Sequence, residues 1–309
     1  MKYKMKQGYD QTRWMPIRFR GFIDLARPFT LIAPFLGVVL GILAVGGATG
    51  LHVPWETIVF AGVTMVLVNA ASNSLNQAAD VDTDTISKPY RPIPQGIVKA
   101  EEARFFSFVL YAFALFRSAM ISEWFSILTL SIIVMTLLYN MEPVRFKRRG
   151  WWANVAIAFP RGLLGFLAAW SVVTPPTDIL PWVLGSMIMC FLIGAQNTKD
   201  YVDVLGDKQC GYITPVIKYG PTKTAFLSLP FILAPSIALM ALGGPRTTFL
   251  PSSAEWVGLI TFWLGVIIVH SMINHRRQDF KSLENSPSWG FMYLTLLAYM
   301  LGFAIIYNI

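Results

Sequence analysis

The chain contains nine stretches of mainly apolar residues, each long enough to cross a lipid bilayer as a helix. Short polar connections separate these stretches, and several connections contain proline or glycine, which end helices. The pattern predicts an all-α polytopic membrane protein with about nine transmembrane helices in one bundle. The predicted helices cover residues 29–47, 55–78, 103–120, 124–140, 153–173, 180–198, 222–242, 255–273 and 289–308.

The composition excludes an ordinary soluble enzyme and a disordered chain. Only 14% of the 309 residues are charged, whereas soluble domains have about 25%. Hydrophobic residues make up 55% of the chain. The two cysteines are too few for a disulfide framework or a four-thiolate zinc site.

The net charge of +8 reports the topology of the chain, because its cations are unevenly distributed. On one side of the predicted bundle lie 22 of the 25 lysines and arginines. Arg117 and Arg246 lie on the other side, and Arg161 lies inside the fifth span. The positive-inside rule therefore predicts a cytoplasmic N-terminus and, with nine spans, a C-terminus outside. We expect a basic cytoplasmic segment at 1–28, a transmembrane domain at 29–309, membrane lipids as partners and no nucleic acid.

Acidic residues near the ends of membrane helices are costly and usually mark a functional site. They gather at the cytoplasmic ends of the second and sixth spans. Spacings of three and four residues align each cluster on one helical face, although Gly206 makes it less certain that the second helix continues far enough. The first cluster contains Asn76, Asp80 and Asp84, and the second contains Asp200, Asp203 and Asp207.

Carboxylates on one face repel one another unless cations lie between them. Mg²⁺ suits such a site, because it binds through a few carboxylates together with substrate phosphates. Two facing clusters could therefore hold a diphosphate with bridging Mg²⁺. The alternative is that these acidic residues only form solvated helix ends. The presence of two clusters at equivalent depth argues against that alternative. Cations near the clusters strengthen the prediction of a site: Lys88, Arg91, Lys199 and Lys208.

Two other interpretations of the acidic residues are weaker. Asp80, Asp82 and Asp84 match the start of an EF-hand loop. Thr85 and Arg91, however, occupy the positions where that loop needs glycine and glutamate. An ion relay in a transporter would lie near the middle of the bilayer, not at one edge.

Arg161 lies about half a span into the fifth predicted helix. An arginine there is costly unless it faces a cavity or reaches the interface. Facing a cavity, it could bind either the diphosphate or an anionic acceptor. We expect Asn154 to share its helical face. Gln196 and Asn197 either support the second cluster or join helices by hydrogen bonds.

Three segments resemble the UbiA superfamily of intramembrane prenyltransferases. Residues 76–96, NQAADVDTDTISKPYRPIPQG, resemble its first aspartate motif, NxxxDxxxD followed in many members by KPxRPxPxG. Residues 197–211, NTKDYVDVLGDKQCG, resemble the second motif, DxxD followed by xxGD. Residues 139–162, YNMEPVRFKRRGWWANVAIAFPRG, resemble the tyrosine and basic loop of the family. With the nine-helix layout, the resemblance extends from about Arg27 to Ile309.

The resemblance implies a central cavity that opens to the membrane. Two Mg²⁺ ions would hold the diphosphate of a prenyl donor between the two aspartate motifs, and ionisation would leave an allylic cation for an acceptor to attack. Implied catalytic residues are Tyr139, which would face the reacting carbon, Asp80 and Asp203. The implied metal ligands are Asp80, Asp84, Asp200, Asp203 and Asp207.

The basic residues that contact the diphosphate are less defined by the resemblance. The basic partner in the family often stands four residues after the tyrosine, where this chain has Pro143. Arg145 and Lys147, further along, therefore become candidates. The full set of expected diphosphate contacts is Asn76, Lys88, Arg91, Arg145, Lys147, Arg161 and Lys199.

These observations predict an Mg²⁺-dependent prenyltransferase whose donor is a prenyl diphosphate of three or four isoprene units, such as geranylgeranyl diphosphate. The hydrophobic acceptor stays open. The motifs resemble branches that act on aromatic acceptors such as homogentisate or hydroxybenzoate. Similar motifs occur in chlorophyll synthases, in archaeal geranylgeranylglyceryl phosphate geranylgeranyltransferases and in carotenoid-elongating branches. A protein that transports isoprenoid phosphates is the alternative to an enzyme. The sequence does not predict the oligomeric state.

Overall fold

The computed structural model describes residues 15–244, 249–274 and 286–308. Within these ranges the chain is helical and forms no β-strand, which confirms the all-α prediction. The helices in the first half are α1 (Ile17–Ala26), η1 (Pro28–Leu31), α2 (Ile32–Thr49), α3 (Trp55–Ala79), α4 (Val81–Ser87), α5 (Ala100–Ala119), α6 (Glu123–Asn140) and η2 (Phe146–Arg148). Those in the second half are α7 (Trp151–Ala158), η3 (Phe159–Leu164), α8 (Gly165–Ser171), α9 (Ile179–Ala195), η4 (Gln196–Lys199), α10 (Asp200–Gln209), α11 (Pro215–Tyr219), α12 (Pro221–Leu242), α13 (Ala254–Ile273) and α14 (Pro287–Asn308).

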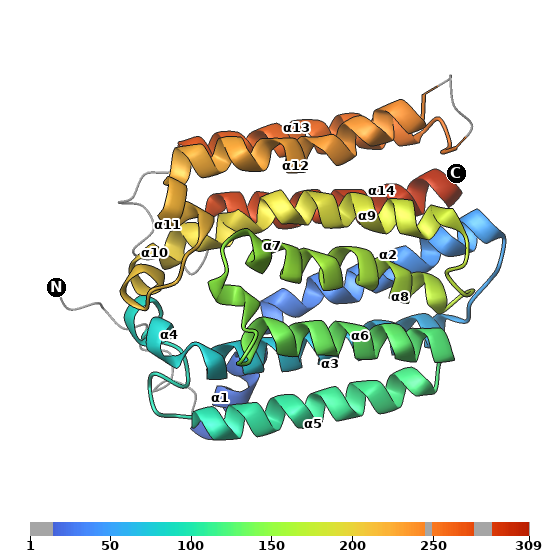
Figure 1. Cartoon of the computed structure of the whole chain (residues 1–309). Helices are drawn as coiled ribbons and strands as arrows, with labels where there is room; N and C mark the ends of the chain where they lie inside the picture. The colour runs from blue at the N-terminus through green and yellow to red at the C-terminus, as the bar shows by residue number, and fades with distance from the viewer. Residues whose placement is uncertain (1–14, 245–248, 275–285, 309) are drawn as a thin grey trace.

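The long helices run side by side along the molecule, with short helices gathered at one end (Figure 1). In the described part of the chain, eight helical segments are long and apolar enough to cross a membrane. Helix α5 corresponds to the predicted span at 103–120. It is less apolar because its ends carry charge, yet it packs against α3 and α6 as part of the same bundle. The prediction of about nine helices in one bundle is therefore confirmed.

Two apolar cores hold the bundle together. One is built mainly from α9, α12, α13 and α14, and the other mainly from α2, α3, α6 and α8. Small residues let the helices approach closely. A side-chain carbon added at Gly41 on α2 would lie only 2.6 Å from Cβ of Ala169 on α8. Large apolar side chains such as Phe105 and Trp256 remain exposed on the outside, as a lipid-facing surface requires.

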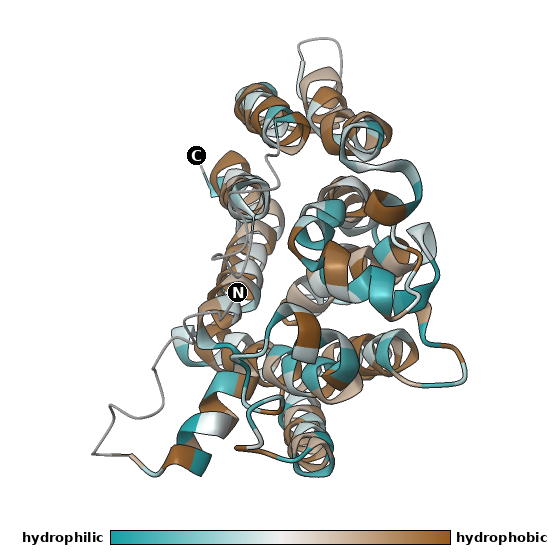
Figure 2. Ribbon diagram, turned by 90° about the vertical axis from the view of Figure 1, so that its left-hand side faces the viewer, coloured by the Kyte–Doolittle hydropathy of each residue, from teal (hydrophilic) through white to brown (hydrophobic). Residues whose placement is uncertain are grey.

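The polar residues gather at the end of the bundle that carries α4 and α10. Figure 2 looks onto this end and shows hydrophilic segments near its middle, between more hydrophobic long helices. Helix α4 packs directly against α10, although they are far apart in the sequence. The C-terminal end of α14 lies at the opposite end of the bundle (Figure 1). The fold thus brings the two acidic clusters together at one end of a membrane-spanning bundle.

Candidate active site

The first acidic cluster lies where one helix ends and another begins. Helix α3 ends at Ala79, and Asp80 takes φ −108° and ψ 19° before α4 starts at Val81. The expectation of one unbroken helical face is therefore wrong at this residue. The amide of Asp84 donates to the carbonyl of Asp80 at 2.8 Å, so Asp80 begins the first turn of α4. Asn76, Asp80 and Asp84 all line one cavity.

The second acidic cluster lies on one continuous helix. Helix α10 passes through Gly206 and ends at Gln209, so the helix does continue past the glycine. Asp200, Asp203 and Asp207 line the same cavity as the first cluster. The two clusters therefore face one space from adjoining helices.

Gly206 allows these two helices to meet. Its amide donates to Oγ of Ser87 at 3.1 Å. A side-chain carbon at this position would lie 2.3 Å from that oxygen and 2.9 Å from the carbonyl oxygen of Thr83. The sequence marks Gly206 only as a possible helix breaker. In the fold, its missing side chain sets the distance between the acidic clusters.

Cations from neighbouring segments neutralise part of the acidic charge. Arg91 contacts Asp84 at 2.7 Å, within the segment that carries the first cluster. Lys147, from η2, pairs with Asp80. Lys88 reaches across to the second cluster and contacts Asp203 at 2.5 Å.

Lys147 lies in the loop after α6, outside the membrane-spanning segments. Burial, with a contribution from nearby Lys199, lowers the pKa of Lys147 to about 8, although Asp207, Asp203 and Asp200 act in the opposite direction. An anionic ligand in the cavity would favour its charged form.

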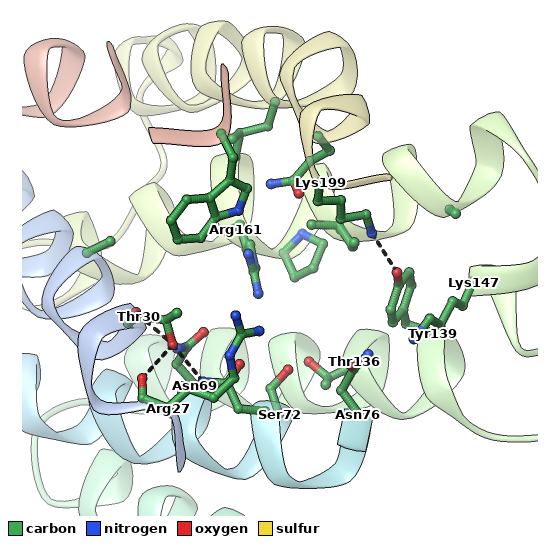
Figure 3. Close-up of a pocket in the computed structure, with 18 of the residues that line it drawn as sticks. Arg27, Thr30, Asn69, Ser72, Asn76, Thr136, Tyr139, Lys147, Arg161 and Lys199 are labelled. Atoms are coloured by element: carbon green, nitrogen blue, oxygen red, sulfur yellow. Dashed lines mark hydrogen bonds between the residues drawn. The ribbon is translucent and has the colours of Figure 1, made fainter. Parts of the chain in front are cut away.

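Tyr139 and Lys199 form a second polar pair on the cavity wall. Lys199 donates to the phenol oxygen of Tyr139 at 2.9 Å, and Tyr139 is buried (Figure 3). Gln196 also lines the cavity. Asn197 instead joins helices, since it accepts from Asn154 at 2.8 Å and donates to Ser228 at 2.8 Å. Gln196 and Asn197 therefore have different roles, which their sequence positions alone do not distinguish.

Arg145 and Arg161 differ in where they point. Arg145 is not among the described residues that line the cavity. Its guanidinium donates to the carbonyl of Ala79 at 2.6 Å and to the phenol oxygen of Tyr212 at 2.8 Å. Tyr212 does line the cavity, so Arg145 positions part of the wall. Arg161 points into the cavity from η3, a π-helical turn within its span (Figure 3).

The carboxylates fit a hard divalent cation that shares its ligands with a substrate. In the described parts of the chain, no three acidic, histidine or cysteine side chains converge closely enough to hold a metal by themselves. Oδ1 of Asp80 is buried without a hydrogen-bond partner. Asp200 and Asp207 make no ion pair with a described residue. Mg²⁺ commonly binds through one or two carboxylates, water and phosphate oxygens, which matches this arrangement.

One cavity residue lies where the sequence gave no reason to look. Arg27 lines the cavity, although it falls among the cations of the expected N-terminal segment at 1–28. Its φ of 53° is unusual for a residue with a side chain, and it separates α1 from η1. Neither charge pattern nor spacing predicts that turn.

The pattern of the UbiA prenyltransferase family matches residues 34–307. Together with the helical bundle, this match defines the chain as an integral, multi-pass membrane protein. The chain belongs to the UbiA prenyltransferase family, and it is an enzyme of the prenyltransferase class.

Named relatives and a solved structure agree with this assignment. The digeranylgeranylglyceryl phosphate synthase of Methanoregula boonei is 30% identical over 68% of this chain and 72% of its own. The bacteriochlorophyll synthase 33 kDa chain of Rhodobacter capsulatus is 25% identical over 67% of this chain and 69% of its own. A UbiA homologue from Archaeoglobus fulgidus, solved with GPP and Mg²⁺, has a TM-score of 0.68 and 19% identity. That match covers 93% of this chain and 99% of the homologue.

Proposed function

We propose that this protein transfers a prenyl group from a prenyl diphosphate to an aromatic or lipid acceptor inside the membrane. One observation carries the proposal: two acidic clusters on α4 and α10 face one cavity whose remaining wall is largely apolar. The charged end suits a diphosphate and the apolar wall suits a prenyl tail. The homologue solved with GPP and Mg²⁺ and the named synthases support this choice.

The donor diphosphate binds at the charged end in this proposal. Mg²⁺ would be held by Asp80 and Asp84 on one side and by Asp200, Asp203 and Asp207 on the other, and when bound it would neutralise charge on the diphosphate. Lys88, Arg91, Lys147 and Lys199 add positive charge there, and the Asn76 amide adds a polar contact. Arg145 acts indirectly, because it holds Tyr212 and the end of α3 in place.

The reaction breaks the bond between the first prenyl carbon and the diphosphate oxygen, and the electron pair leaves with the diphosphate. The acceptor oxygen or carbon then forms a bond to that carbon and gives up a proton. Basic groups around the diphosphate stabilise the charge that develops on it. Tyr139 offers its ring to the electron-poor prenyl carbon, and Lys199 holds that ring in place. The apolar wall excludes water, which would otherwise consume the cation.

The acidic end of the bundle faces the cytoplasm in this proposal. The described beginning of the chain and both acidic clusters lie at one end of the bundle, while α14 finishes at the other (Figure 1). The excess of cations at the acidic end supports the orientation. The boundary between the N-terminal segment and the membrane domain stays a prediction at residue 28. Some of the cations counted for this orientation lie outside the described residues: Lys2, Lys4, Lys6, Arg13, Arg276, Arg277 and Lys281 on the basic side and Arg246 on the other side.

A direct assay tests the proposal. The purified protein, given geranylgeranyl diphosphate, Mg²⁺ and a panel of aromatic and lipid acceptors, should release diphosphate and form a prenylated product. Omission of Mg²⁺ should stop the reaction. The proposal would be contradicted if no diphosphate were released with any donor and acceptor. Saturable uptake of prenyl phosphates into vesicles would then indicate a transporter.

A further inference from the structure

Helix α1 contacts the rest of the protein through one of its faces. Gly21 and Leu25, one helical turn apart, are buried on that face. Leu25 packs into a small apolar core with Ala78 of α3 and with Ile93. A side-chain carbon added at Gly21 would lie only 2.9 Å from a methyl carbon of Val98, so the glycine allows the close contact. This contact fixes which residues of α1 point away from the protein.

The residues of α1 that point away from the protein are mainly apolar. Phe19 and Ile23, also one turn apart, are 59% and 36% exposed, and Ile17 at the start of the helix is 46% exposed. Phe22 contacts Phe106 of α5, with the ring centroids 5.2 Å apart, so α1 adjoins a helix that carries part of the lipid-facing surface. An exposed apolar patch that continues such a surface suits contact with lipid.

Helix α1 is not part of the membrane span that follows it. The apolar segment Ile17–Thr49 has 33 residues, whereas about 20 are enough to cross a bilayer. The left-handed turn at Arg27 separates α1 from η1 and α2. Figure 2 looks onto the polar end and shows α1 from its side at the edge of the bundle, while the long helices are seen nearly end-on. Helix α1 therefore runs along the end of the bundle, where lipid headgroups would lie.

Cations border the exposed apolar residues of α1. Arg18 contacts Glu102 of α5 at 2.5 Å, and 63% of its side chain is exposed. A guanidinium has five N–H donors, more than this one contact uses. Arg20 pairs with Asp24 at 3.7 Å. Residues 1–28 together hold seven lysines and arginines and only two aspartates. An apolar stripe bordered by cations is typical of helices that lie in the interface of an anionic membrane.

Hydrogen bonds from α3 hold α1 in this position. The end of a helix leaves carbonyl groups without partners. Gln77 donates to the carbonyl of Leu25 at 2.9 Å, and Asn73 donates to the carbonyl of Ala26 at 2.8 Å. Asn73 also donates to Oγ1 of Thr30 at 2.8 Å. The exposed face is therefore already formed in the folded protein, which lowers the entropic cost of binding a partner.

We propose that α1 presents a binding surface for acidic phospholipids of the leaflet at the polar end. This surface, called the α1 surface, consists of Ile17, Phe19 and Ile23 with the bordering Arg18 and Arg20. Its apolar side chains enter the boundary between headgroups and acyl chains, and its arginines contact headgroup phosphates. The inference goes beyond prenyl transfer, because it adds a lipid partner that is not a substrate.

Spin labels test whether the α1 surface lies in lipid. In a chain with Cys190→Ser and Cys210→Ser, Phe19→Cys carries a nitroxide, and Lys208→Cys on exposed α10 is the control. In vesicles of phosphatidylcholine with about a quarter phosphatidylglycerol, oxygen should relax the label at residue 19 more than a water-soluble nickel chelate does. The order should be reversed at residue 208. A label at residue 19 that is as open to nickel as the control would overturn the proposal. A label closed to both reagents would also overturn it and would indicate a protein neighbour.

Local quenching tests the preference for acidic lipid. A dye at Phe19→Cys in the same background is quenched by phosphatidylglycerol or by phosphatidylcholine, each with a spin-labelled acyl chain. Phosphatidylglycerol should quench at least about threefold more strongly, and added salt should reduce the difference. The further change Arg18→Gln with Arg20→Gln should abolish it. Lys218→Gln with Lys223→Gln removes two exposed cations of α11 and α12 and should leave it unchanged.

The outcome of the quenching experiment distinguishes the α1 surface from the general basic charge of the polar end. Arg18→Lys with Arg20→Lys keeps the charge and should keep the preference for phosphatidylglycerol. Equal quenching by both lipids in the parent chain would refute the proposal, and so would a preference that the Lys218 and Lys223 changes abolish. Neither experiment contains a prenyl donor or acceptor, so the result is independent of the proposed prenyl transfer.

Discussion

The two acidic clusters look alike in sequence but differ in how the protein balances their charge. In the first cluster, Asp80 pairs with Lys147 and Asp84 pairs with Arg91. In the second cluster, only Asp203 has such a partner, namely Lys88 from the other cluster's segment. The buried Asp200 and Asp207 have no ion pair among the described residues.

Because of this difference, we expect the two clusters to depend unequally on a bound cation. Buried carboxylates without a partner are costly, so the second cluster gains most from a divalent ion. The first cluster already has its cations and can orient a phosphate through them. We therefore expect α10 to dominate metal affinity and the first cluster to contribute more to the geometry of the diphosphate.

The largest expected effect comes from removal of one carboxylate from either cluster. Asp80→Ala and Asp203→Ala should each lower kcat about 10³-fold or more, because each removes a group that stabilises the departing diphosphate. Asp82→Ala is the matched control, since Asp82 lies on α4 but is exposed and outside the cavity lining. Thermal unfolding should show that all three variants fold. Full activity in either cluster variant would exclude its residue from the site.

A second prediction addresses the difference between the clusters. Asp207→Asn should raise the Mg²⁺ concentration for half-maximal activity about 10- to 100-fold, whereas Asp84→Asn should raise it about threefold. Titration of diphosphate release with Mg²⁺ measures both values. Equal shifts in the two variants would show that the clusters share the metal evenly.

Contact between the helices that carry the clusters supplies a third, smaller effect. Gly206→Ala should lower kcat about tenfold, because its new side chain would push α10 away from Ser87 of α4. The double variant with Ser87→Ala should recover part of the loss. Ser87→Ala alone controls for the loss of its hydrogen bond with the Gly206 amide. A double variant no better than Gly206→Ala would mean that the spacing of the helices is not what the glycine provides.

The smallest effect is expected from the support of the cavity wall. Arg145→Gln should lower kcat about three- to tenfold, since Arg145 holds Tyr212 and the end of α3 but does not line the cavity. Tyr212→Phe removes the same hydrogen bond, so the double variant should lose less than the product of the two single losses. Independent, multiplying losses would indicate that Arg145 contacts the substrate directly.

Much of the fold could be predicted because its determinants are local. Apolar runs of spanning length define the long helices, and spacings of three and four residues identify both acidic clusters. The sequence failed where contacts between distant segments decide the outcome. The break at Asp80 and the direction of Arg145 depend on such contacts. Lys147 pairs with a residue 67 positions away, which no local pattern reveals.

Arg27 shows most clearly what the sequence could not provide. Its charge fits a cytoplasmic tail. Hydrogen bonds within the turn and from asparagines of α3, which lies far along the sequence, hold the backbone that places Arg27 in the cavity lining. The depth of Arg161 in its span predicts a residue that faces a cavity, and the structure places it in the cavity lining. The left-handed backbone at Arg27 and the π-helical turn η3 are both irregular. Local helix propensity does not predict either of them.

The central claim is that both clusters hold one donor diphosphate through a divalent cation. Calorimetric titration with a prenyl thiolodiphosphate, which resists ionisation, tests it without any acceptor. The account predicts tight binding with Mg²⁺, at least 100-fold weaker binding without it, and binding weakened at least tenfold in both Asp80→Ala and Asp203→Ala but not in Asp82→Ala. Binding that is unchanged without Mg²⁺, or that survives loss of either cluster, would contradict it.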